Sequence, residues 1–279
     1  SMPSQTFSDC PASRMLTRAM VLLAAARTAS AFLPRRLATA RSRALSVVGK
    51  QGLADGSDGI ELYSSQAIAE GATPALTLFF LHGLGDTANG WAGAFAGQGV
   101  DVPGESFKVV LPTASTVPVT LNGGMAMPSW FDLYGLDAAD PVDEPGIDAA
   151  AARLLALAER EAEDTKVVFG GFSQGGAVAL TAGLRADFDV EGIVGASTWL
   201  PLAETYPAKL ATGAAARPVG LFHGSEDLTV RTSWGEETRD VLAGLGFDVA
   251  WHAYAGMAHS ACEAEFADMA AFLRKVASK

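Results

Sequence analysis

Short apolar runs alternate with amphipathic segments along most of this chain. The apolar runs that read as strands lie at residues 60–64, 75–81, 107–111, 167–169, 190–197, 218–222 and 247–254. Helical spacing follows at residues 87–98, 146–163, 229–245 and 260–276, and an apolar helix begins at residue 177. Strands and helices that alternate in this way predict one α/β domain with a doubly wound, mostly parallel sheet and helices on both faces.

Ser173 lies where an apolar strand turns into an apolar helix, within the sequence GGFSQGGAVAL at residues 170–180. Gly171 and Gly175 flank this serine two residues away on either side, where a sharp strand-to-helix turn leaves no room for a Cβ. The G-x-S-x-G pattern therefore predicts a nucleophile elbow. A serine hydroxyl is a weak nucleophile at neutral pH, so the elbow also requires a base and an oxyanion site.

Two further strand ends carry a candidate acid and a candidate base. Asp227 follows the strand at 218–222, and His259 follows the last strand. Sites in open parallel sheets lie at the carboxyl ends of the strands, and the order Ser, Asp, His is that of an α/β-hydrolase triad. In this triad Ser173 attacks the acyl carbon, His259 takes and returns the proton, and Asp227 orients the imidazole.

The residues alone leave competitors for two of these roles. Glu226 is an alternative acid, and either carboxylate could instead cap a helix. The other three histidines, His82, His223 and His252, lie in or beside strands, where a histidine is commonly a core or turn residue bonded to the backbone. Only His259 lies in a loop beyond the last strand, which favours it as the base.

The oxyanion site needs two backbone N–H groups. The residue after the nucleophile, Gln174, supplies one. Leu84, in the loop HGLGD at residues 82–86, is the candidate for the other, since Gly83 and Gly85 let the backbone bend around an oxygen. We find no zinc-ligand spacing, no phosphate-binding glycine loop and no dinucleotide fingerprint, so we expect no metal and no cofactor.

Charge and cysteine content restrict the partners and the compartment. The net charge is −11, and residues 1–50 carry eight basic residues against Asp9, so the remaining residues carry −18. A domain with this much negative charge repels phosphate groups, which argues against binding to nucleic acid and against docking on anionic lipid. The two cysteines are Cys10 and Cys262; once a leader is removed only one thiol remains, which fits a reducing compartment.

Residues 1–50 have the composition of a targeting leader, which leaves residues 51–279 as the catalytic domain. A basic start at Arg14, an apolar run at 19–26 and the small-residue site at 29–31 are typical of a secretory signal, and this run is too short to span a bilayer. Residues 32–50 are rich in Arg, Ser and Ala, as in an organelle transit peptide. We expect a bipartite leader directing the chain to a plastid. A mitochondrial leader, or an Ala-rich tail on a cytoplasmic protein, is the alternative.

Several segments together resemble a known family. The sequences LHGLGD at 81–86, PVTLNGGMAMPSWFDL at 118–133, GGFSQGGAVAL at 170–180, STWLPL at 197–202, HGSEDLTV at 223–230 and GMAHSACEAE at 256–265 resemble the acyl-protein thioesterases. These belong to the phospholipase/carboxylesterase group of α/β hydrolases. The resemblance covers nearly all of residues 60–275 and implies the α/β-hydrolase fold, the same triad and the same oxyanion donors.

The resemblance also implies a substrate. In the family the long loop around MPSWFD helps form an apolar channel for an acyl chain, which would place Met127, Trp130 and Trp199 near the site, although such aromatics are also common in cores. The implied activity is cleavage of fatty-acyl thioesters or esters of proteins or lysolipids. A general carboxylesterase or lysophospholipase is the alternative, and an inactive lipid-binding hydrolase fold is a second one. The family usually has Pro after the triad acid, whereas Leu228 and Thr229 follow here.

Overall fold

The computed structural model describes residues 46–53, 56–63, 73–98, 106–137 and 140–278. Nearly all of the expected leader at residues 1–50, including Cys10, lies outside the described residues, so the leader and the plastid location stay predictions. None of the helices in the described ranges is long and apolar enough to cross a membrane.

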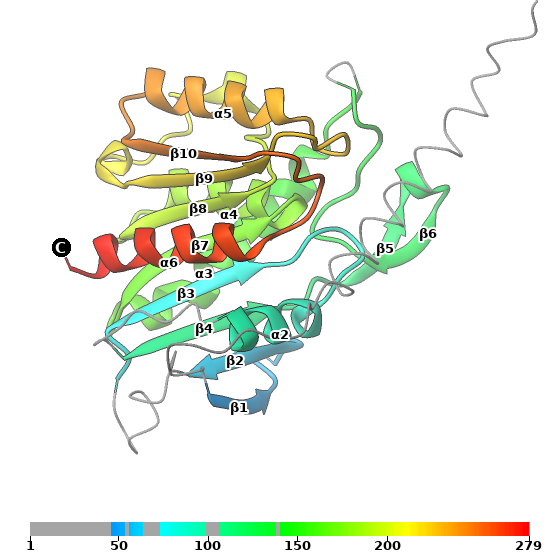
Figure 1. Ribbon diagram of the computed structural model, residues 1–279. Coiled ribbons are helices and arrows are strands. Elements are labelled where there is room, and N and C mark those ends of the chain that lie inside the picture. The colour runs from blue at the N-terminus through cyan, green and yellow to red at the C-terminus, as the bar shows by residue number, and fades with distance from the viewer. Residues whose placement is uncertain (1–45, 54–55, 64–72, 99–105, 138–139, 279) are drawn as a thin grey trace, which may run out of the picture.

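One twisted sheet forms the centre of the molecule (Figure 1). Its order is β1-β2-β4-β3-β7-β8-β9-β10; β1 and β2 run antiparallel to their neighbours and the pairs from β4 to β10 are parallel. The strands are β1 (Ser46–Gln51), β2 (Gly59–Tyr63), β3 (Leu76–Leu81), β4 (Phe107–Pro112), β7 (Lys166–Phe172), β8 (Gly192–Ala196), β9 (Val219–Gly224) and β10 (Val249–Tyr254). The predicted doubly wound, mostly parallel sheet is confirmed.

Helices cover both faces of this sheet. They are α2 (Ala88–Gln98), α3 (Glu144–Ala162), α4 (Gln174–Arg185), α5 (Thr232–Gly244) and α6 (Glu263–Ala277), with short 3₁₀ turns η1 (Thr120–Asn122), η2 (Ala203–Thr205) and η3 (Ala214–Ala216). In Figure 1, α2 and α6 lie on the near face, while α3 and α4 lie behind the sheet. A sheet covered in this way is apolar on both faces, which explains the uninterrupted apolar runs of the central strands.

Strand β3 shows how the two cores divide. Leu76, Leu78 and Phe80 pack with Trp91 and Phe95 of α2, whereas Phe79 and Leu81 pack with α3 and α4 on the other face. Successive side chains of a strand point to opposite faces, so one buried strand of six residues contributes to both cores. This buried strand ends at the loop that carries Leu84.

The expected edge strand at 60–64 is not the edge of the sheet. It appears as β2, but β1 pairs antiparallel with it, so the sheet extends into the last residues of the segment assigned to the leader. The alternation of β2 is that of a strand with one well-covered face, and such a pattern does not distinguish an edge strand from its neighbour.

The long segment at 113–136, for which the apolar pattern predicts neither a strand nor a helix, contains a hairpin. Strands β5 (Thr116–Val119) and β6 (Met125–Pro128) pair antiparallel through a turn at Gly123 and Gly124, both of which have positive φ. Two prolines sit in these strands, and proline in a strand argues against a central position. A two-stranded ribbon has no central strand, so the hairpin tolerates both.

Three helix boundaries differ from the expected ones. Helix α3 begins at Glu144 because Asp143 accepts the N–H of Gly146 and Pro145 fits in a first helical turn. Helix α5 begins at Thr232, not residue 229. Helix α6 begins at Glu263, not at residue 260, and its N-cap is Cys262.

Candidate active site

The nucleophile elbow connects β7 to α4. Ser173 has φ 54° and ψ −122°, a conformation that a non-glycine residue adopts only when its surroundings enforce it, and its N–H donates to Ala196 O of β8 at 2.9 Å. A Cβ at Gly171 would lie 2.4 Å from the backbone of Gly175, and one at Gly175 would lie 2.3 Å from Leu81 O. Both glycines are therefore required by close backbone approach, as the G-x-S-x-G pattern predicts.

His259 stands over the elbow from the loop after β10. Its Nε2 lies 3.0 Å from Ser173 Oγ, and its Nδ1 lies 2.7 Å from Asp227 Oδ2. The ring packs on Phe172, with 4.7 Å between ring centroids. Three residues from separate strand ends thus form one hydrogen-bonded row, with Asp227 at one end and the serine hydroxyl at the other.

Asp227 is held rigidly after β9. Its Oδ1 accepts the N–H groups of Thr229 and Val230, both at 2.9 Å. Burial alone would raise the pKa of Asp227, but hydrogen bonds from His223 and His259 outweigh it and lower the pKa to about 2. The carboxylate is therefore ionised at neutral pH, as a group that orients an imidazole must be.

The alternative acid points elsewhere. Glu226 is exposed, while Asp227 is buried among its hydrogen-bond donors. Leu228, which stands where the resembling family usually has Pro, is 86% exposed. The contacts of Asp227 do not depend on the Leu228 side chain, because Thr229 and Val230 supply their backbone N–H groups.

The acid and base loops are joined through their backbones. Glu226 N–H donates to Met257 O at 3.0 Å, and Gly256 N–H donates to Ser225 Oγ at 2.9 Å. Gly224, at the end of β9, lets the loops approach: a Cβ there would lie 2.2 Å from Met257 O. The parallel pairing of β9 with β10 and these loop contacts together fix the distance between Asp227 and His259.

Two of the other three histidines, His82 and His252, make contacts away from the triad. His82 Nδ1–H donates to Gly83 O at 2.7 Å, its Nε2 accepts Ala114 N–H at 3.0 Å, and burial lowers its pKa to about 4. His252 stacks on Phe222, with 5.1 Å between the ring centroids. His223 is different, because it lies 3.5 Å from Asp227 Oδ2 while its Nε2–H donates to Val230 O at 2.9 Å. It is a neighbour of the acid that the sequence did not suggest.

The two expected oxyanion donors belong to the residue after the serine and to a loop that approaches it, since a Cβ at Gly83 would lie 3.4 Å from Ser173 Cβ. Gln174 is the first residue of α4, where a backbone N–H has no partner within the helix. Within the described residues, neither this N–H nor that of Leu84 has an acceptor, whereas the neighbouring Gly85 N–H donates to Pro128 O at 2.8 Å. Gly85 has φ 77°, which turns the loop at Leu84. Over the described part of the chain, both N–H groups therefore meet one requirement of an oxyanion donor, which is to be free of an acceptor within the protein.

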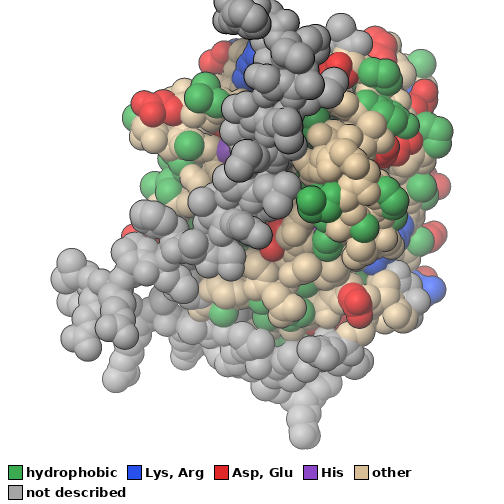
Figure 2. All heavy atoms as spheres, turned by 90° about the vertical axis from the view of Figure 1, so that its right-hand side faces the viewer, with side chains coloured by type: hydrophobic (Ala, Val, Ile, Leu, Met, Phe, Trp, Pro, Cys, Tyr) green, Lys and Arg blue, Asp and Glu red, His purple; other side chains and the backbone are tan. Residues whose placement is uncertain are grey.

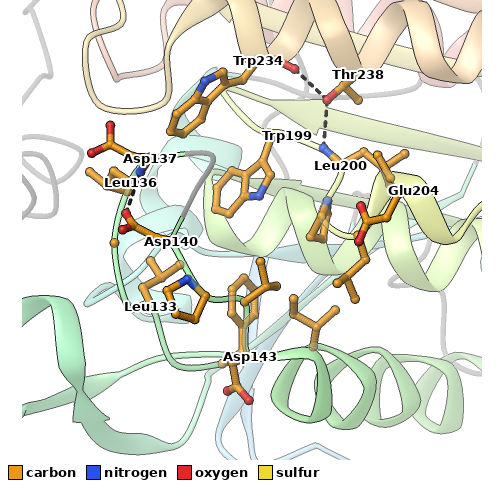
Figure 3. Close-up of a pocket in the computed structure, with 18 of the residues that line it drawn as sticks. Leu133, Leu136, Asp137, Asp140, Asp143, Trp199, Leu200, Glu204, Trp234 and Thr238 are labelled. Carbon is orange, nitrogen blue, oxygen red and sulfur yellow. Dashed lines mark hydrogen bonds between the residues drawn. The ribbon is translucent and has the colours of Figure 1, made fainter.

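A cavity of about 390 Å³ opens between residues 131–137 and 140–143, the loop 199–204 and helix α5 (Figure 3). Trp199 lies in its centre and Trp234 above it, 6.4 Å apart by ring centroids. Its apolar lining comes from Phe131, Leu133, Leu136, Val142, Ile147, Trp199, Leu200, Trp234 and Val241. Among the described residues that line it there is no Lys, Arg or His, whereas Asp137, Asp140 and Glu204 are present.

The three residues assigned to substrate by resemblance are placed differently from one another. Trp199 lines the cavity. Trp130 does not; its indole Nε1–H donates to His82 O at 2.8 Å and its ring packs on His82. Met127 lies in strand β6, where its sulfur accepts Asn122 Nδ2–H at 3.2 Å.

Sequence reasoning missed most of the cavity wall. Leu133 and Leu136 follow MPSWF in a segment without clear periodicity, and Trp234 lies on a helix for which the sequence suggests no role in the site. The only indication of this wall in the sequence is the mixture of apolar and acidic residues at 133–143. Seen from the carboxyl edge of the sheet, acidic and hydrophobic side chains are interspersed with few basic ones (Figure 2).

Comparison with known proteins gives consistent results. A family model described as phospholipase/carboxylesterase matches residues 64–277. Acyl-protein thioesterase 1 of Gibberella zeae is 40% identical over 210 residues, which cover 71% of this chain and 89% of that protein. Acyl-protein thioesterase 1 of Mycosarcoma maydis is 40% identical over 227 residues, covering 74% and 93%.

Solved structures agree with this fold. The crystal structure of Zea mays acyl-protein thioesterase 2 is 30% identical, with a TM-score of 0.69 and coverage of 78% of this chain and 99% of that one. The Bacillus cereus carboxylesterase is 16% identical with a TM-score of 0.59, which concerns the fold alone.

Proposed function

Because this chain belongs to the phospholipase/carboxylesterase family, we propose that it hydrolyses fatty-acyl thioesters or esters through an acyl-enzyme on Ser173. The observation that carries the proposal is the continuous row from Asp227 Oδ2 through His259 to Ser173 Oγ, at 2.7 and 3.0 Å. Both distances are within hydrogen-bond reach, the first requirement for a general base and its orienting acid.

The proposed reaction has two halves. Ser173 Oγ attacks the acyl carbon while His259 Nε2 takes its proton; the Oγ–C bond forms, and the oxygen of the carbonyl becomes an oxyanion bonded to the N–H groups of Leu84 and Gln174. When the C–S or C–O bond breaks, His259 returns the proton to the leaving thiol or alcohol. Water then attacks the acyl-enzyme with the same base, and the fatty acid leaves.

Asp227 contributes by holding one tautomer. With its carboxylate ionised and 2.7 Å from Nδ1, it keeps the proton of the neutral imidazole on Nδ1, so Nε2 faces Ser173 as an acceptor. The same carboxylate stabilises the imidazolium formed during the attack. Each oxyanion donor in such a site is worth about 10²–10³ in turnover.

The cavity is the proposed site for the acyl chain. Two of its lining residues, Phe131 and Trp199, are linked to the elbow. Phe131 O accepts Gln174 Nε2–H, and Trp199 directly follows Thr198, whose hydroxyl donates to Ser173 O. A cavity of this size with a mainly apolar wall is typical of small-molecule sites.

Acylated proteins are the proposed physiological substrates, because the curated relatives at 40% identity are acyl-protein thioesterases. Depalmitoylation of proteins is the finer form of this proposal. Lysophospholipids and simple carboxylic esters are the competing substrates, since the family description includes phospholipases and carboxylesterases.

The test is a kinetic panel with acyl-thioesters, oxyesters and lysophospholipids of two to sixteen carbons. We expect long thioesters to have the highest kcat/KM, and Ser173→Ala to lower kcat by about 10⁵–10⁶ while the protein stays folded. Val241→Trp, which fills the cavity, should raise KM about tenfold more for long chains than for acetyl, whereas Val241→Ala should not. Retained activity in Ser173→Ala would refute the mechanism, and a Val241→Trp effect equal at all lengths would refute the chain site.

A further inference from the structure

The side chain of Gln174 makes contacts that the proposed mechanism does not use. It is fully buried, and all of its polar capacity is directed at residues 129–131. Its Oε1 accepts the N–H of Trp130 at 3.1 Å, and its Nε2 donates to Phe131 O at 2.7 Å and to Ser129 Oγ at 3.0 Å. Ser129 Oγ in turn donates to Phe131 O at 2.6 Å. One amide therefore binds the backbone on both sides of Trp130.

The segment that Gln174 binds is also attached to the other oxyanion loop. Pro128 O accepts Gly85 N–H at 2.8 Å, and the Trp130 indole N–H donates to His82 O at 2.8 Å. These two contacts lie on either side of Leu84. Residues 128–131 consequently bridge the loop that carries Leu84 N–H and the helix start that carries Gln174 N–H.

The same segment continues into the wall of the cavity. Phe131 lines the cavity and lies edge-to-face against Trp199, with ring centroids 6.5 Å apart. The next residue is fixed as well, because Asp132 N–H donates to Asp143 Oδ2 at 2.8 Å. The position of the chain-binding wall relative to Ser173 is thus determined by the contacts of residues 129–131.

We propose that the side chain of Gln174, with Ser129, is a positioning device that keeps the two oxyanion donors and the acyl-chain wall in one fixed geometry. This inference rests on the proposed function. The backbone N–H of Gln174 would contact the oxyanion, whereas its side chain acts only through residues 128–131. A preorganised donor pair matters because an oxyanion is stabilised only by donors already in place, and a shift of about 1 Å in such groups costs about 10² in rate.

Two variants of graded severity test the proposal. Gln174→Met keeps the length of the side chain and the backbone N–H but removes every contact to Trp130 N–H and Phe131 O. Ser129→Ala removes only the hydroxyl and leaves those two Gln174 contacts in place. We expect kcat for a dodecanoyl thioester to fall about 30- to 100-fold in Gln174→Met and about 3- to 10-fold in Ser129→Ala.

The matched control is Thr181→Val, which removes a buried hydrogen bond to Ala177 O from the same helix α4 without touching residues 128–131. Its kcat should stay within twofold of the parent protein. Melting temperature is measured for all three, so that turnover is compared only between folded proteins. If Gln174→Met does not fold, Ser129→Ala carries the test.

Inhibition by alkyl trifluoromethyl ketones separates positioning from general destabilisation. Their adduct with a serine places an oxyanion in the proposed hole, so Ki should rise in parallel with the loss of kcat, and more for a dodecyl than for a butyl ketone. Folded Gln174→Met and Ser129→Ala proteins with parent-like kcat and Ki would overturn the inference. Activity that survives Ser173→Ala would instead overturn the proposed function, so the two failures are distinguishable.

Discussion

Gly224→Ala is expected to impair catalysis without touching the substrate or any triad side chain. A Cβ at this position would lie 2.2 Å from Met257 O and 2.7 Å from Ala258 O, in the loop that presents His259. Ordinary Cβ contacts start near 3.4 Å. The loop must therefore retreat by roughly 1 Å, and a misplacement of that size in a catalytic group lowers the rate by about 10².

The assay is kcat/KM for a soluble short-chain thioester, together with the melting temperature. Gly93→Ala is the matched control, because Gly93 lies in α2 and an added Cβ would meet nothing within 4 Å. That change should leave activity unaltered and add about 0.5–1 kcal/mol to the free energy of unfolding. If folded Gly224→Ala keeps activity within threefold of the parent, the rigid coupling of the two loops is wrong.

Two further predictions concern buried carboxyl groups. Asp227→Asn should lower kcat by about 10⁴, through loss of the useful tautomer, while the exposed neighbour change Glu226→Gln leaves it unaltered; equal kinetics of the two variants would make the acid assignment wrong. The lowered pKa of Asp227 also stabilises the fold above pH 3.8, and this stabilisation is lost as the pH falls toward about 2. At about 1.4 kcal/mol for each pKa unit, the shift from 3.8 to about 2 corresponds to about 2.5 kcal/mol in the free energy of unfolding. Glu265 behaves in the opposite way. Burial raises its pKa from 4.5 to about 8, although the N–H of Cys262 donates to it and favours the charged form. The folded protein therefore favours the neutral carboxyl, and the stability that Glu265 contributes is present below pH 4.5 and is lost as the pH rises toward 8. Urea unfolding across pH 4–9 should therefore show the stability of the parent falling relative to Glu265→Gln by up to about 5 kcal/mol, and a flat difference would contradict the burial argument.

The sequence was sufficient for the parallel part of the sheet and for the placement of the three triad residues, but not for the edge strand β1. Ser173, Asp227 and His259 each follow an apolar run, and parallel strands bring their carboxyl ends to one edge whatever the loops do between them. The close approach of the backbone at the elbow can also be predicted from the sequence, because only glycine fits at 171 and 175. These features are local or follow from topology.

The cavity could not be predicted in the same way. Its wall combines Leu133, Trp199 and Trp234 from three segments without regular period, and their meeting depends on packing between loops. Trp130 illustrates the ambiguity: the residue type suits an apolar channel, yet its indole N–H is used by His82 O. His223 was similarly hidden, since its proximity to Asp227 arises from the turn at residues 224–230.

The contacts of Gln174 show why residue type alone is a weak guide near a site. Its place after the nucleophile predicts a backbone role, and nothing in the sequence pattern indicates where a flexible amide will reach. The partners are backbone groups at 130 and 131, some forty residues earlier in the chain, brought there by the hairpin β5–β6 and the start of α3. Such long-range pairings need coordinates.

The most direct test of the central claim is to trap the acyl-enzyme. The protein is mixed with a hexadecanoyl thioester, quenched in acid within one turnover and digested for peptide mass spectrometry. We expect one hexadecanoyl group on the peptide that contains Ser173, decaying at the rate of turnover and absent from Ser173→Ala. An acyl group found instead on Cys262, or steady turnover that persists in Ser173→Ala, would contradict the account.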